Sequence, residues 1–126
     1  MLDLFIDFHG PGNRRHPYFI CALSANLPTE KQQENRRRYF DAAEVFEQRG
    51  YGQSMTQIEH SQRDIDVSGM SLSRDWVTMN TTDHNISLTL EVNMNTPLST
   101  RDGYRAEAIA LGRGIANYFV NGLHQR

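Results

Sequence analysis

The clearest strand pattern in the sequence is the stretch Asn85-Ile86-Ser87-Leu88-Thr89-Leu90-Glu91-Val92. Its even-numbered residues are all apolar and its odd-numbered residues are all polar, and this period of two puts the two sets on opposite faces of a β-strand. The polar face is small and neutral at Ser87 and Thr89 and then ends in the carboxylate of Glu91. Burying a carboxylate is costly unless it is paired, so Glu91 needs a reason to occupy this position.

A second strand is predicted at the beginning of the chain, over Leu2-Asp3-Leu4-Phe5-Ile6-Asp7-Phe8. Leu4, Ile6 and Phe8 would face one side of the sheet, and Phe5 adds apolar surface to the other. Strands that are apolar on both faces belong in the middle of α/β sheets, under helices. This strand therefore needs a neighbour on each side, and we expect the chain to be a fragment of a larger fold.

The other expected elements are bounded by turn or capping residues: a strand over 18–24, a helix over 30–49 and a helix over about 100–123. Thr29 is the expected N-cap of the first helix, and Ser99 or Thr100 that of the second. Residues 53–84 are polar, and we expect mostly irregular structure there with short elements.

The last helix carries one predicted apolar face, formed by residues that recur at steps of three and four: Tyr104, Ala108, Leu111, Ile115 and Phe119. Gly112 and Gly114 weaken the helix locally. Glycines inside a helix usually mark close packing against a neighbouring element.

The order strand, strand, helix, strand, helix predicts a single α/β domain with a mostly parallel sheet. A hydrophobic content of 38% and a charged content of 22% are typical of a folded domain. The net charge of −2 gives no reason to expect nucleic acid or an anionic membrane as a partner. No apolar stretch is long enough to span a bilayer. The single cysteine, Cys21, excludes an internal disulfide and a cysteine-based metal cluster.

Two polar residues lie where ligands bind in open α/β sheets, beyond the carboxyl ends of the strands. His9 directly follows the first strand, and Glu91 lies near the end of the strand over 86–92. If these strands are parallel, both side chains reach the same edge of the sheet, as a metal ligand and an adjacent general base would. Taken alone, a histidine after a strand is more often a loop or core residue, and a glutamate there is usually solvated or ion-paired.

Two motifs carry a resemblance to a known family. The stretch Leu4-Phe5-Ile6-Asp7-Phe8-His9-Gly10 is similar to the strand of carboxypeptidase A/B-type zinc peptidases that ends in their third zinc ligand. The stretch Leu88-Thr89-Leu90-Glu91, followed by a short loop and a long helix, resembles the strand that carries the catalytic glutamate of that family.

The resemblance implies the C-terminal half of the zinc carboxypeptidase-like (phosphorylase/hydrolase-like) fold, a mixed, mostly parallel sheet with flanking helices. It also implies zinc as cofactor, a peptide C-terminus as substrate and hydrolysis of the last peptide bond. His9 would be a zinc ligand. Glu91 would take a proton from the attacking water and pass it to the leaving amine.

The stretch Ser73-Arg74-Asp75-Trp76 resembles the family's loop that lines the pocket for the C-terminal side chain of the substrate. In that reading Arg74 lies near the floor of the pocket and favours an acidic terminal residue. The alternative is a surface arginine that pairs with Asp75.

The chain also departs from the family. The other two zinc ligands come from a His-x-x-Glu motif in the family's N-terminal half, and this motif occurs nowhere in residues 1–126. The family's mobile tyrosine has no counterpart, since no tyrosine occurs between Tyr51 and Tyr104. A catalytic zinc ion needs about three protein ligands. We therefore expect a peptidase only if another segment completes the domain. The alternative is a non-catalytic binding domain that self-associates through an open sheet edge.

Overall fold

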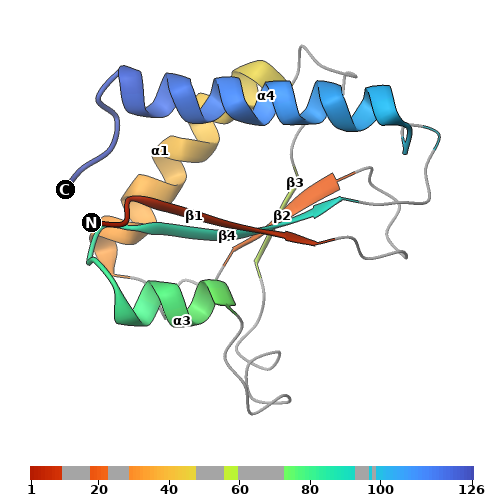
Figure 1. Cartoon of the computed structure of the whole chain (residues 1–126). Helices are drawn as coiled ribbons and strands as arrows, with labels where there is room; N and C mark the ends of the chain where they lie inside the picture. Colours follow the sequence, from red (N-terminus) through yellow and green to blue (C-terminus); the bar gives the residue numbers. More distant parts are fainter. Residues whose placement is uncertain (10–17, 23–28, 48–55, 60–72, 93–96, 98) are drawn as a thin grey trace.

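The computed structural model describes residues 1–9, 18–22, 29–47, 56–59, 73–92, 97 and 99–126 (Figure 1). The strands among them are β1 (Leu4–His9), β2 (Tyr18–Ala22), β3 (Thr56–Glu59) and β4 (Ile86–Val92). The helices are α1 (Glu30–Glu47), α3 (Ser73–Asn80) and α4 (Arg101–Val120). The predicted strands and helices are found, and among the described residues of 53–84 the short elements are β3 and α3.

The strands form one mixed sheet in the order β1-β4-β2-β3. β1 is parallel to β4 and β2 is parallel to β3, whereas β2 runs antiparallel to β4. The predicted α/β class is confirmed, and two of the three strand pairings are parallel.

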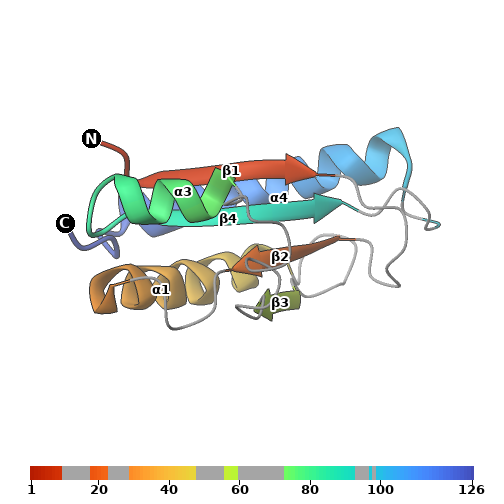
Figure 2. The same cartoon turned by 90° about the horizontal axis from the view of Figure 1, so that it is seen from below.

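Helices cover both faces of the sheet. α1 and α4 lie on one face and α3 on the other (Figures 1 and 2). In the part of the chain that the structure describes, no helix is both long and apolar enough to cross a membrane.

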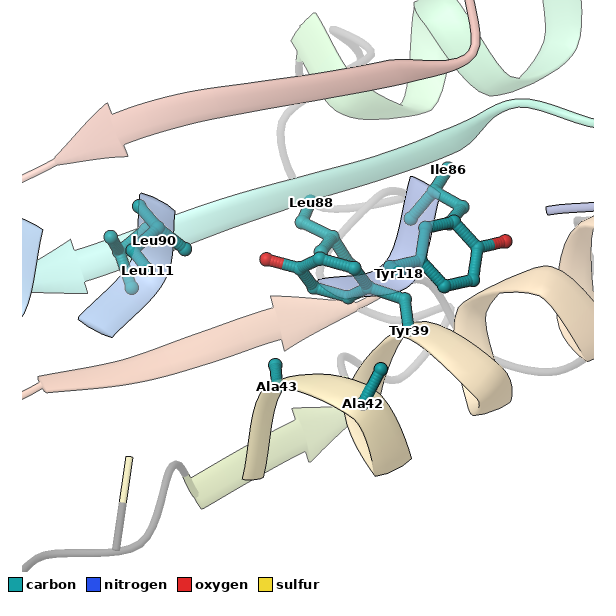
Figure 3. Close-up of a cluster of buried hydrophobic side chains, with 8 residues drawn as sticks. All are labelled: Tyr39, Ala42, Ala43, Ile86, Leu88, Leu90, Leu111 and Tyr118. Carbon is teal, nitrogen blue, oxygen red and sulfur yellow. The ribbon is translucent and has the colours of Figure 1, made fainter. Parts of the chain in front are cut away.

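The hydrophobic core lies between β4 and the helices α1 and α4 (Figure 3). Ile86, Leu88 and Leu90 of β4 are buried in this core. Ser87 and Thr89 are buried too, but on the opposite, polar face of the strand. The helices contribute five buried residues to this core: Tyr39, Ala42, Ala43, Leu111 and Tyr118. The alternation predicted for this strand is therefore confirmed as far as Leu90.

The first turns of α1 and α4 are capped as predicted. The backbone N–H of Gln32 donates to Thr29 Oγ1 over 3.1 Å, and the Gln32 side chain accepts from the Thr29 backbone N–H over 2.7 Å. This reciprocal pair is a capping box, which satisfies two N–H groups at the start of the helix. Thr100, rather than Ser99, caps α4, because its hydroxyl accepts from the Gly103 N–H over 3.0 Å.

The apolar face predicted for α4 is only partly correct. Leu111 is buried, but Tyr104 and Ala108 are exposed. The buried residues of α4 are mostly small: Gly103, Ala110, Leu111, Gly114 and Tyr118. Gly114 lies directly against Ala43 of α1, where the lack of a side chain lets the two helices approach closely. Ile115 and Phe119, two further residues of the predicted face, are partly buried against the core.

β1 occupies the edge of the sheet, although its sequence predicts a strand with a neighbour on each side. Among the described strands it pairs with β4 alone. Leu4 and Ile6 pack against the core, but Phe8 is 64% exposed. No other described strand takes the outer side of β1, so its expected second neighbour stays a prediction.

Candidate functional site

His9 and Glu91 lie opposite each other at the end of the sheet. β1 and β4 are parallel, and their register pairs His9 with Glu91. The sequence predicted that the two residues meet if their strands are parallel, and the backbones of β1 and β4 fulfil this condition. The side chain of Glu91 lies outside the part that the structure describes.

A carboxylate that the sequence prediction did not single out holds the imidazole of His9. Asp7 Oδ2 lies 3.0 Å from His9 Nε2, and both side chains are partly exposed. The hydroxyl of Ser73, at the start of α3, donates to the same oxygen of Asp7. This hydrogen bond, with the neighbouring His9, lowers the pKa of Asp7, so the carboxylate is ionised at neutral pH. Asp7 and His9 are two residues apart on a strand, and this spacing alone places them on one face.

Arg74 lies in the first turn of α3, and the residues Ser73–Trp76 are helical rather than the predicted loop. Its side chain is only 1% exposed, so the alternative of a surface arginine is wrong, although the expected pairing with Asp75 is found. Nε lies 3.1 Å from Asp75 Oδ1, and Nη1 donates to Thr89 Oγ1 over 3.3 Å. A buried guanidinium requires such partners because an unpaired charge in the interior is costly.

These residues form one polar cluster, which we define as Asp7, His9, Ser73, Arg74, Asp75 and Thr89. The hydrogen bond between Arg74 and Thr89 places the guanidinium on the polar face of β4, two positions before Glu91. Nη2 of Arg74 and Oδ2 of Asp75 are buried and make no hydrogen bond with residues that the structure describes. The cluster thus has an accessible part, the imidazole of His9 and the carboxylate of Asp7, at the end of the sheet where ligands bind in α/β folds, and a buried part formed by Arg74 and Asp75.

The polar cluster alone does not fit a catalytic zinc ion. Such an ion takes about three protein ligands, and among the described residues the grouping of metal-ligating side chains is a different one: Asp3, His84 and His124. The sequence gives no spacing that would reveal this second grouping, since its members lie far apart along the chain. His9 can contribute one ligand, but the others would have to come from another segment.

The comparisons with known proteins found a solved structure in which a part resembles this chain. No protein-family model matches the sequence, and no curated protein matches it. A solved structure, described as a metallo-carboxypeptidase from Burkholderia cenocepacia, superimposes with a TM-score of 0.61 and 21% sequence identity. The match covers 94% of this chain and 31% of that protein. The chain therefore has the fold of part of that metallo-carboxypeptidase and spans about a third of its length.

Proposed function

We propose that this chain is the C-terminal part of a zinc carboxypeptidase domain, which becomes active when a segment carrying His-x-x-Glu completes it. His9 is one zinc ligand in this proposal and Glu91 is the general base. The observation that carries it is the register of β1 and β4, which sets His9 against Glu91 at the ligand-binding end of the sheet. The shared fold with part of a metallo-carboxypeptidase supports it.

The register suits the chemistry of peptide hydrolysis. Neighbouring strands lie about 4.8 Å apart, so side chains from paired positions can reach the same reacting group. Glu91 would accept a proton from the attacking water and deliver it to the leaving amine. A general base must lie within hydrogen-bond reach of that water, and a position beside a metal ligand provides this. Asp7 would hold the ring of His9 in a fixed orientation, as carboxylates do for metal-binding histidines.

Arg74 is the proposed determinant of substrate preference. Its guanidinium is fixed by Asp75 and Thr89, and Nη2 is a buried donor that no described residue satisfies. A carboxylate on the C-terminal side chain of a peptide would supply an acceptor for this donor. The completed enzyme would then prefer peptides that end in Asp or Glu.

The outer edge of β1 is where the completing segment would join. β1 is paired with β4 alone among the described strands. A strand from the completing segment would add to this edge, cover Phe8 and bring the His-x-x-Glu ligands toward His9.

The test is to join or co-express the chain with a segment that carries His-x-x-Glu and to measure release of C-terminal amino acids. We expect Glu91→Gln to abolish release while bound zinc is retained, and His9→Gln to weaken zinc binding. Glu44→Gln on the exposed side of α1 is the control and should have no effect. The proposal fails if the completed, zinc-loaded protein releases nothing from any peptide, or if Glu91→Gln is fully active.

The exposed edge of β1 also supports a second candidate, a non-catalytic domain that self-associates through this edge. In that case two chains would pair along β1, and Glu91→Gln would leave every function intact. Sedimentation at increasing protein concentration distinguishes the two, because a monomer at all concentrations contradicts self-association.

A further inference from the structure

A second cluster of ionisable side chains lies at the opposite end of the same two strands. Asp3 precedes β1, His84 precedes β4, and His124 follows α4. The two ends of the chain lie close together there (Figures 1 and 2). Nε2 of His84 is 3.2 Å from Asp3 Oδ1, and Nε2 of His124 is 3.3 Å from the same oxygen. One ligand atom from each residue lies within 4.8 Å of the others.

Both histidines are buried, and the Nδ1 atom of each ring contacts another side chain. Their side chains are 6% and 5% exposed, and that of Asp3 is 19% exposed. His84 Nδ1 lies 3.1 Å from Asp83 Oδ1, and His124 Nδ1 lies 2.9 Å from the hydroxyl of Tyr118. Each ring therefore turns its Nε2 toward Asp3 while a protein group engages its other nitrogen. Metal-binding histidines are typically oriented in this way.

One polar atom in the cluster is poorly satisfied. Nε2 of His124 is buried and makes no well-aligned hydrogen bond with any residue that the structure describes. It lies 3.3 Å from Asp3 Oδ1, which is short enough for an ion pair but not aligned as a hydrogen bond. A buried polar atom with a poorly aligned partner destabilises the fold, and a cation between the two rings and the carboxylate would satisfy it.

The carboxylate of Asp3 is held by the C-terminal arginine. Arg126 donates to both of its oxygens, from Nη2 to Oδ2 over 2.7 Å and from Nε to Oδ1 over 3.3 Å. Oδ1 is also the oxygen that both histidine rings approach. A carboxylate oxygen has more than one lone pair, so Oδ1 can accept from Arg126 and still face the two rings.

We propose that Asp3, His84 and His124 form a binding site for a divalent transition-metal ion, of which zinc fits best. Tetrahedral zinc with bonds of about 2.0–2.1 Å sets neighbouring ligand atoms about 3.3 Å apart. The separations of the two Nε2 atoms from Asp3 Oδ1, 3.2 and 3.3 Å, match this spacing, and the ligand atoms of the three residues all lie within 4.8 Å of one another. Imidazole nitrogen with one carboxylate favours zinc over magnesium or calcium, which prefer oxygen ligands.

This site is separate from the one that contains His9. Asp3 and His9 lie before and at the end of β1, and six residues of strand at about 3.3 Å each put them roughly 20 Å apart. The proposed ion therefore does not depend on the peptidase proposal. The ion would connect the segments just before β1 and β4 with the C-terminal segment after α4. Because it would bind only when these segments are together, it would stabilise the folded chain.

The experiment uses the whole 126-residue chain after treatment with a chelator. Zinc alone is titrated by calorimetry, and the melting temperature is measured with and without zinc. We expect one zinc ion per chain and a raised melting temperature. Asp3→Asn, which keeps the shape of the side chain, should weaken zinc binding by at least about tenfold. Asp102→Asn, which makes the same change at an exposed carboxylate of α4, is the matched control and should bind zinc like the unsubstituted chain.

A second measurement needs no substitution, in case a variant fails to fold. Long-range proton–nitrogen spectra of the imidazoles should show zinc shifting the ring nitrogens of His84 and His124 before those of His9. The proposal is overturned if the chain binds no zinc at millimolar concentration, if Asp3→Asn binds it equally well, or if only the resonances of His9 move.

Discussion

Gly114 of α4 lies directly against Ala43 of α1, so that a Cβ added at Gly114 would be 3.0 Å from both the Cα and the Cβ of Ala43. The Cα atom belongs to the backbone and cannot rotate away. Gly114→Ala should therefore push the helices apart and lower the free energy of unfolding by about 1–3 kcal/mol.

Gly112 of the same helix provides the control for that change. A Cβ there would meet nothing within 4 Å. Gly112→Ala should raise the free energy of unfolding by roughly 0.5–1 kcal/mol, because alanine is the better helix former. Urea denaturation of both variants checks the pair. Equal effects of the two substitutions would contradict the close helix contact.

The buried pair of Arg74 and Asp75 makes a second prediction. Asp75→Ala leaves a guanidinium in the interior without its carboxylate partner, and breaking such a pair costs about 3–5 kcal/mol. Trp76→Ala changes the next residue of the same helix, which is exposed, and should cost far less. Denaturant unfolding compares the two. If Asp75→Ala is no more destabilising than Trp76→Ala, the pair contributes nothing to folding.

The residues of β4 and the pair His9 and Glu91 show which features a sequence pattern can predict. The alternation over 86–90 correctly predicted which side of β4 enters the core, because a period of two is a local property of the backbone. The opposition of His9 and Glu91 followed once the strands proved parallel. Both predictions rest on regular elements with one strongly apolar face.

Other features depend on contacts between distant segments. From the sequence, Arg74 looks like a surface or loop residue, because an arginine in a polar stretch is usually exposed. Its burial depends on the contact between its short helix, α3, and Thr89 of β4, which the sequence does not reveal. The apolar pattern of α4 correctly predicted that Leu111, Ile115 and Phe119 pack against the core. It did not predict the close fit of Gly114 on Ala43, which depends on where α1 lies. The grouping of Asp3, His84 and His124 exists only in the folded chain.

The pH dependence of stability gives a third prediction, from Glu34 on α1. Hydrogen bonds from Arg37 and then Arg38 lower the pKa of Glu34 from 4.5 to about 2. Because the folded state has the lower pKa, the unfolded chain takes up the proton first as pH falls. The contribution of Glu34 is therefore complete above pH 4.5 and is lost between pH 4.5 and about 2.

Glu34→Gln should consequently flatten the loss of stability across this window, as measured by urea denaturation at stepwise lower pH. Val45→Ala, which changes an exposed side chain of α1 without removing an ionisable group, serves as the control. High salt should shrink the difference from the unsubstituted chain, since these side chains are solvent-accessible. A slope that is identical in Glu34→Gln and the unsubstituted chain would contradict this assignment.

Asp7 and Asp83 make a matched pair that separates the two histidine sites. Asp7 lies 3.0 Å from a ring nitrogen of His9, and Asp83 lies 3.1 Å from a ring nitrogen of His84. Removing a carboxylate that orients a metal-binding histidine typically costs about 10–100-fold in metal affinity. In the domain completed with His-x-x-Glu, Asp7→Asn should therefore raise the zinc concentration for half-maximal peptide release by at least about tenfold. Asp83→Asn should leave that concentration unchanged and weaken only zinc binding at Asp3, His84 and His124. If both variants require the same zinc concentration for peptide release as the unsubstituted domain, Asp7 does not orient a catalytic ligand, and the assignment of His9 to the zinc ion loses the support of its contact with Asp7.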